Sequence, residues 1–265
     1  MTSINPGIFT EFAVEISVAD LPAFFPDPFN YNPHPLALLA AEMLQKHLRE
    51  QSEWSHNFGL KDGGEGPIIG KMFGVLVVKN ARNQLGYLSS YSGKLAGGYH
   101  QSRFVPPVFD GLSKGSFLNI GMEKLAGINV EIKMLEEEDA LANKVKIDFL
   151  KISRKEHSTK LQDEIFSHYK FLNVTGAEKS LYQIFREFNN SKPPSGAGEC
   201  AAPRLLQYAF QNNMNPVALA EFWWGLSPKS DFWKHGQFYP ACREKCDPIL
   251  THMLKGMDIE AGKEV

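Results

Sequence analysis

The sequence predicts a fold of the α/β (α+β) class, because segments with helical and strand periodicity follow one another along the chain. From Pro35 to about residue 50, apolar residues recur every three or four positions among charged ones, which is typical of an amphipathic helix. Two short apolar runs, 71–78 and 85–91, are separated by a polar turn of hairpin length. A third apolar run, 216–224, lies between two helical segments. Helices that alternate with strands in this way indicate a sheet covered by helices.

Composition excludes several classes of protein. The 265 residues are 43% hydrophobic and 22% charged, which is ordinary for a globular chain. The net charge of -2 gives no overall basic field, so a nucleic-acid partner would need a local basic patch. No apolar run reaches the roughly 18 residues that a membrane span needs, and no export signal is visible. We therefore expect a cytoplasmic protein with no membrane association.

We expect a single domain, 1–265, with four parts. Residues 1–35 are rich in Pro and Phe and predict an extended arm. Residues 36–110 contain the helix and the β-hairpin, and 127–172 predicts a charged helical insertion rich in Lys and Glu. Residues 193–257 contain every cysteine of the chain, with helices expected at 204–211 and 249–255.

The cysteines are the strongest chemical signal. Cys200 lies where a glycine-rich loop leads into a helix, and a helix N-terminus favours the thiolate form. Cys242 and Cys246 are four residues apart, so on a helix they would share one face. Three thiolates can hold zinc, and His235 could be a fourth ligand that closes the site. The alternative is that the cysteines are small buried apolar residues.

Aromatic and basic residues flank the cysteines and could contact unpaired bases. The candidates for contact with RNA or substrate are Trp233, Lys234, Arg243, Lys245 and His100. The alternative is that the aromatic residues pack in the core.

Several long segments resemble the N-terminal accessory region of long bacterial RluA-type pseudouridine synthases. They are 70–77, 85–97, 104–110, 195–209, 220–225 and 238–246. The synthase domain of that family carries its catalytic aspartate in an Arg-Leu-Asp motif, and this motif is absent from the chain. The resemblance implies association with modification of tRNA or rRNA, or with a pseudouridine synthase, but no synthase activity of this chain.

The order of hairpin, cysteine at a helix start, strand and paired cysteines is similar to the zinc-dependent nucleobase deaminase fold. That resemblance implies a three-layer arrangement with a central mixed sheet and a catalytic Glu two residues after the first zinc ligand. Here that position is Ala202, and Glu199 precedes Cys200 instead. Three hypotheses follow: a zinc-binding accessory domain that contacts RNA, an active deaminase that uses Glu199, and a scaffold with buried free cysteines.

Overall fold

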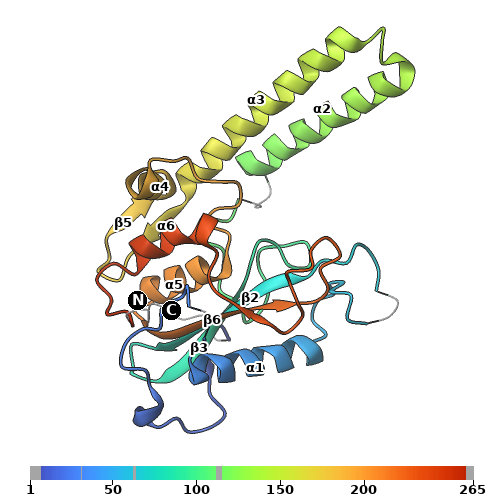
Figure 1. Ribbon diagram of the computed structural model, residues 1–265. Coiled ribbons are helices and arrows are strands. Elements are labelled where there is room, and N and C mark those ends of the chain that lie inside the picture. Colours follow the sequence, from blue (N-terminus) through green and yellow to red (C-terminus); the bar gives the residue numbers. More distant parts are fainter. Residues whose placement is uncertain (1–6, 31, 62–63, 112–114, 261–265) are drawn as a thin grey trace. The chain divides into compact units, whose positions relative to one another are not determined.

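The computed structural model describes residues 7–30, 32–61, 64–111 and 115–260 (Figure 1). Contacts divide the chain into two compact units, the first formed by 1–108 with 170–265 and the second by 109–169. Residues 1–6 and 31 of the expected arm lie outside the described residues. None of the helices in the described ranges combines the length and the apolar character that crossing a bilayer requires.

A five-stranded sheet organises the first unit. Its strands lie in the order β1 (Thr10–Glu11), β3 (Leu85–Tyr91), β2 (Lys71–Lys79), β6 (Asn215–Trp224) and β7 (Phe238–Tyr239). The β2–β3 hairpin matches the two predicted strands, and β6 matches the third. In the hairpin turn, the side chain of Asn80 accepts hydrogen bonds from the backbone of Arg82 and Gln84, which closes the turn.

The sheet differs from the expected mixed sheet, because every pair of neighbouring described strands is antiparallel. The strands β3 and β6 run in the same direction, but β2 lies between them and runs the opposite way. The connection through helix α5 (Ala201–Gln211) therefore joins two strands that do not pair. The mixed α and β content was predicted correctly, and the strand pairing was not.

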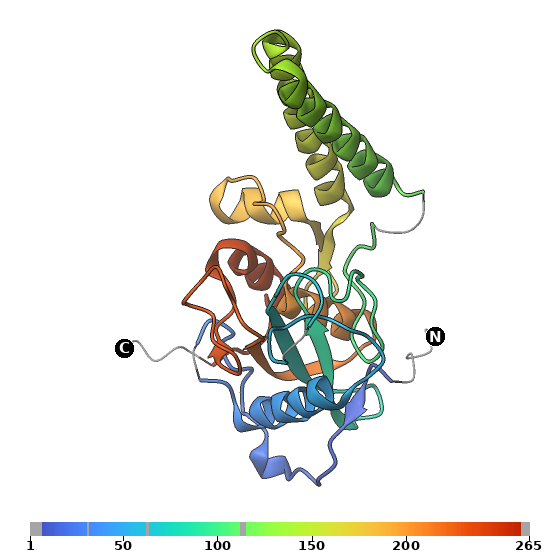
Figure 2. The ribbon, with the colours of Figure 1, turned by 90° about the vertical axis from the view of Figure 1, so that its right-hand side faces the viewer.

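Helices cover both faces of this sheet (Figures 1 and 2). Helix α1 (Pro35–Glu50) packs on one face, and α5 on the other with α6 (Arg243–Met253) beside it. Pro35 occupies the first turn of α1, where its missing N–H costs nothing. The α1 face is an apolar core, to which α1 contributes six residues: Leu36, Ala37, Ala40, Ala41, Leu44 and Leu48.

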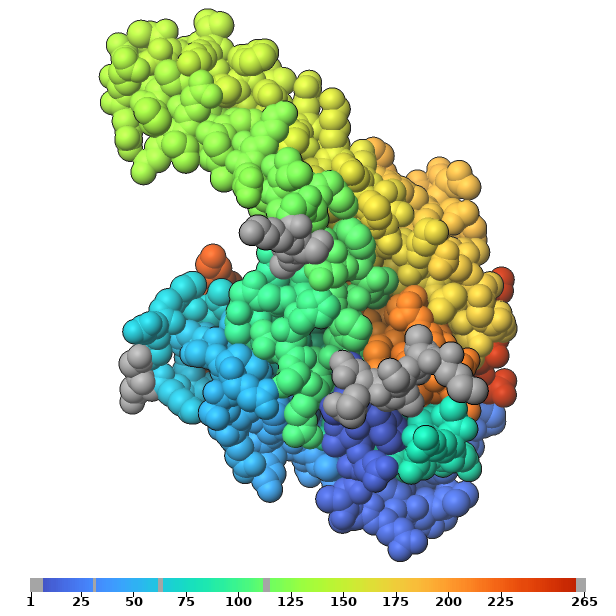
Figure 3. All heavy atoms as spheres, turned by 180° about the vertical axis from the view of Figure 1, so that it is seen from behind, coloured from blue at the N-terminus to red at the C-terminus, as the bar shows by residue number. Residues whose placement is uncertain are grey.

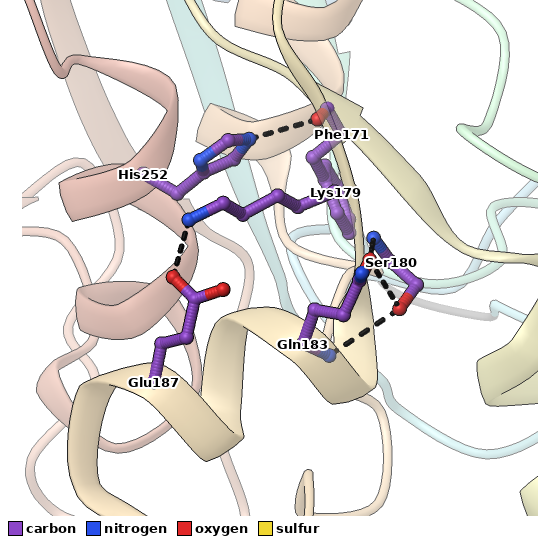
Figure 4. Close-up of polar contacts among 6 residues, drawn as sticks. All are labelled: Phe171, Lys179, Ser180, Gln183, Glu187 and His252. Atoms are coloured by element: carbon purple, nitrogen blue, oxygen red, sulfur yellow. Dashed lines mark hydrogen bonds and ion pairs between the residues drawn. The ribbon is translucent and has the colours of Figure 1, made fainter.

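A small second sheet ties α6 to helix α4 (Leu181–Asn189). It consists of β4 (Lys170–Leu172) and β5 (Glu178–Ser180). Figure 4 shows the ring Nε2 of His252, on α6, hydrogen-bonded to the carbonyl oxygen of Phe171 at 2.9 Å. Lys179 pairs with Glu187, and Ser180 forms a capping box with Gln183 at the start of α4.

The described part of the arm packs on the first unit. The backbone N–H of Phe25 donates to the carbonyl of Asp258 at 2.9 Å, and the N–H of Ala241 donates to the carbonyl of Pro28 at 2.8 Å. A short 3-10 helix, Val18–Asp20, lies earlier in the arm. The arm therefore reaches the segment that carries Cys242.

The second unit is a hairpin of two long helices, α2 (Phe117–Asp139) and α3 (Lys144–His168). The helices begin ten residues earlier and end four residues earlier than the predicted 127–172 insertion. Their contact is apolar and buries Ile132, Leu135 and Ile147. Near the base of the hairpin, Phe109 stacks on His168 with ring centroids 4.7 Å apart.

Candidate metal centre

Two helix N-termini carry cysteines. Cys200 is the N-cap residue of α5, and Cys242 is the N-cap residue of α6. Before Cys200, Gly196 and Gly198 have φ angles of 75° and 88°, a backbone conformation that glycine adopts without strain. The loop can therefore turn sharply into α5.

Helix α6 begins at Arg243, six residues before the predicted start at 249. The prediction placed Pro248 just before the helix, and proline in a helix interior does remove a backbone hydrogen bond. In the structure Pro248 lies within α6 and is buried. The earlier start puts Cys242 at the helix N-terminus and Cys246 one turn later.

The three thiols meet at Cys246. Hydrogen bonds link the Cys246 side chain to Cys200 and to Cys242. Cys246 is fully buried, Cys200 is half-buried and Cys242 is exposed. The structure therefore brings together the three cysteines that the sequence singled out.

The thiols differ in how easily they ionise. The hydrogen bond from Cys246 and the backbone N–H groups of Lys245, Glu244 and Cys246 lower the pKa of Cys242 to about 5. The pKa of Cys246 is raised, because the neighbouring sulfurs of Cys200 and Cys242 favour its protonated form and because it is buried. Cys242 is thus a thiolate at neutral pH, and a nearby cation would favour ionisation of the other two.

Glu221 is the carboxyl group beside this cluster, and it was missed from the sequence. Burial and, to a smaller extent, the negative charge of Cys242 raise its pKa to about 8, against the opposing effect of the hydrogen bond from Ala202. The backbone N–H of Ala202 donates to Glu221 Oε1 at 3.3 Å. The sequence did contain a signal: Glu221 is the one charged residue in the apolar run 216–224. Burying a carboxyl group costs free energy, so such a position indicates a functional role.

Gly74 allows α5 to approach the sheet at this point. It pairs with Glu221 on β6. A Cβ atom on Gly74 would lie 3.0 Å from Ala201 Cβ and 3.1 Å from Leu205 Cδ1. A larger residue would therefore push the first turn of α5, and Cys200 with it, away from Glu221.

Glu199, the predicted catalytic carboxylate, interacts with Tyr99 and Lys71. Its Oε1 accepts a hydrogen bond from the hydroxyl of Tyr99 at 3.3 Å, and its negative charge acts on the ammonium of Lys71. Burial lowers the pKa of Lys71, with a further contribution from Arg204. Glu199 thus belongs to a polar group next to the cysteines.

His235, the predicted fourth ligand, lies on the other face of β6. Its Nδ1 accepts from the N–H of Gly225 at 3.1 Å, and its ring packs on Trp224 with centroids 4.4 Å apart. Trp224 belongs to the core beneath α1, whereas Glu221, an odd number of residues away on the same strand, faces α5. The structure therefore does not bring His235 to the thiols.

The predicted contact residues are scattered. Trp233 is half-buried and stacks on Trp223 with centroids 5.1 Å apart, and Lys234 beside it is exposed. Arg243 lies over the ring of Phe29 at 4.5 Å. Lys245 Nζ lies 3.6 Å from where a Cβ on Gly196 would be, and His100 is exposed after β3.

Within the described ranges, no three His, Cys, Asp or Glu side chains already form a set that could hold a metal ion. Zinc held by thiolates at ~2.3 Å in a tetrahedron keeps its sulfurs about 3.8 Å apart. Metal binding would therefore require the cysteine side chains to turn toward a common point. Comparisons with protein-family models, curated proteins and solved structures found no match to this chain.

Proposed function

We propose that the chain is a zinc-binding, deaminase-like accessory domain in RNA modification, without pseudouridine synthase activity of its own. The observation that supports it most is the meeting of three thiols, from the N-termini of two helices, around Cys246. Helices α5 and α6, which flank strand β6, each begin directly after a cysteine, and this placement of the cysteines supports the proposal.

The donor set fits zinc chemically. Three thiols and a carboxyl group with a raised pKa lie together, and they cannot all be charged without a cation. Cys200, Cys242 and Cys246 would hold the ion, and Glu221, whose charge acts on Cys246, would be the fourth ligand or would hold a proton beside it. Zinc would join α5 to α6 and would contribute folding free energy.

Metal analysis of protein purified without added zinc tests the proposal. We expect about one zinc per chain, lost in Cys246→Ser and kept in Ser195→Ala, an exposed serine in the loop before Cys200. Less than about a tenth of a zinc ion per unmodified chain would contradict the proposal and would favour the hypothesis of a scaffold with free cysteines.

An active deaminase is the alternative, and Glu221 rather than Glu199 is the carboxyl group that favours it. In a deaminase one carboxyl group takes a proton from the attacking water and passes it to the base, which a pKa near the working pH favours, and the pKa of Glu221, about 8, is near neutral pH. Ammonia release from cytidine, adenosine or tRNA, abolished in Glu221→Gln but kept in Glu199→Gln, would establish it. No release from any substrate would leave the accessory role ahead.

The RNA part of the proposal depends on exposed residues near β7. Phe232 is 65% exposed and Lys234 is exposed, so a base could stack beside a positive charge. We expect tRNA binding that weakens with salt, and Lys234→Gln should reduce the magnitude of the salt slope by about 1. Affinity independent of salt would argue against RNA contacts.

A further inference from the structure

A groove on the α1 side of the first unit has no role in the proposed metal centre. Its volume is about 1050 Å³, and it runs from the end of α1 along residues 51–61 to Trp224 and His235. Figure 3 shows the segments 51–61 (light blue) and 92–108 (green) on one face of this unit. Ligand sites commonly have volumes of roughly 300–1,000 Å³, so the groove could enclose a small molecule.

The wall of the groove is held in place before any ligand binds. The side chain of Gln51 accepts from the backbone N–H of Glu53 and of Trp54 and donates to the carbonyl of Trp54. His56 uses both ring nitrogens, one with the carbonyl of Ile69 at 2.8 Å and one with the N–H of Ala96 at 3.4 Å. The 51–61 segment is therefore held at its start by Gln51 and near its middle by His56.

Hydrogen-bond donors gather at the end of the groove that is floored by Trp224. The guanidinium of Arg49 lies over the Trp224 ring, 5.8 Å from its centroid. Among the described residues, no acceptor or carboxylate pairs with this guanidinium, which contacts the Trp224 ring. Because Nδ1 of His235 accepts from Gly225, the proton of the neutral imidazole is on Nε2. Burial and the nearby Arg49 charge lower the pKa of His235, so the ring stays neutral at pH 7.

Aromatic and acidic residues also line the groove. Trp54 is half-buried and packs edge-to-face on Phe58, with ring centroids 6.3 Å apart. Glu53 also lines the groove, but its carboxylate is hydrogen-bonded to Ser102 on the neighbouring segment. Glu65 and Lys61 also line the groove and carry opposite charges. Positive charge therefore faces the Trp224 end, beside a flat apolar wall.

We propose that this groove binds a small planar ligand that carries a phosphate or a carboxylate. The anionic group lies between the Arg49 guanidinium and Nε2–H of His235, and the planar ring lies against Trp54. This site is on the face of β6 opposite the cysteines, so it does not depend on the metal. A charged group held by Arg in a partly enclosed site gains strong, directional hydrogen bonds.

Calorimetric titration of the full chain tests the proposal, with uridine monophosphate, indole-3-carboxylate, uridine and inorganic phosphate as probes. We expect one of the two planar anions to bind at least about 10-fold more tightly than uridine and inorganic phosphate. The planar anion that binds more tightly shows whether the site prefers a phosphate or a carboxylate. Binding of uridine as tight as that of both planar anions would overturn the anion assignment, and so would an absence of binding by all four probes.

Variants locate the site. Arg49→Gln should weaken the planar anion about 10-fold or more, whereas Arg82→Gln, an exposed arginine in the β2–β3 turn, should not change it. Trp54→Leu should also weaken binding of the planar anion. Thermal unfolding of Arg49→Gln should be the same as that of the unmodified chain, which shows that this variant is folded. Equal affinity in Arg49→Gln and the unmodified chain would place binding elsewhere and overturn the proposal. The same affinity is expected with and without zinc, so loss of the metal centre would not be mistaken for loss of this site.

Discussion

The two faces of the central sheet bury different kinds of side chain. Toward α1 the sheet presents Phe73, Phe222 and Trp224, which are almost fully buried among other apolar residues. Toward α5 and α6 lie Glu221 and the buried Cys246, and Arg204 of α5 is only 1% exposed. Buried ionisable groups cost free energy unless they are paired. The α1 face is therefore an apolar core, whereas the α5 and α6 face buries ionisable groups in addition to apolar residues such as Leu205 and Leu206.

The largest effect expected is loss of packing on the α1 face. Phe222 is fully buried and stacks on Phe73 with ring centroids 6.0 Å apart. Phe222→Ala should lower the free energy of unfolding by about 3–5 kcal/mol, measured by urea denaturation. Val130→Ala, at a 59% exposed position on α2, should change it by less than about 0.5 kcal/mol. Equal effects of the two changes would contradict the role given to this core.

A pH dependence should come from the opposite face. The pKa of Glu221 in the folded chain, about 8, lies above its ordinary value of 4.5. Between these values the folded chain keeps a proton on Glu221 that the unfolded chain has lost, so the contribution of Glu221 to stability falls as pH rises, by at most about 1.4 kcal/mol per pH unit. The lowered pKa of Cys242, about 5, contributes in the opposite direction, because the folded chain has lost a proton that the unfolded chain keeps. In metal-free protein, Glu221→Gln should remove only the Glu221 contribution, so the variant should gain stability relative to the unmodified chain from pH 5 to pH 8. Parallel pH profiles for the two proteins would show that Glu221 titrates normally.

A smaller effect is expected where α5 approaches the sheet. Gly74→Ala would place a methyl group 3.0 Å from Ala201 Cβ, and we expect a loss of about 1–3 kcal/mol in unfolding free energy together with weaker zinc binding. Gly127→Ala is the matched control, because nothing lies within 4 Å of the new methyl group in α2. It should stabilise the helix by about 1 kcal/mol. Unchanged zinc affinity in Gly74→Ala would separate the metal centre from this contact.

Local signals in the sequence were sufficient for much of the fold. The helix at 35–50, the β-hairpin and the strand at 216–224 have clear periodicity, and the structure has them within a few residues. The pairing of β6 with β2 was not predictable, because it depends on contacts between segments some 140 residues apart. Helix α6 was placed too late because a buried helix can accommodate Pro248.

The candidate site was predicted in part. Cys200, Cys242 and Cys246 were recognised from spacing and from their positions at helix starts, which are local features. Glu221 and His235 were misjudged, because which face of β6 each residue meets depends on strand register and on the loop 225–237. Trp233 was predicted to contact RNA or substrate, and in the structure the turn before β7 stacks it on Trp223.

Cobalt titration of the metal-free chain tests the central claim most directly, because thiolate ligands give cobalt an intense charge-transfer absorption. If Cys200, Cys242 and Cys246 form one metal centre, the band should saturate at about one cobalt per chain and vanish when zinc is added. Cys200→Ser should weaken the band, whereas His235→Ala should leave it unchanged. Absence of the band in the unmodified chain, or a full band in Cys200→Ser, would contradict the three-cysteine centre.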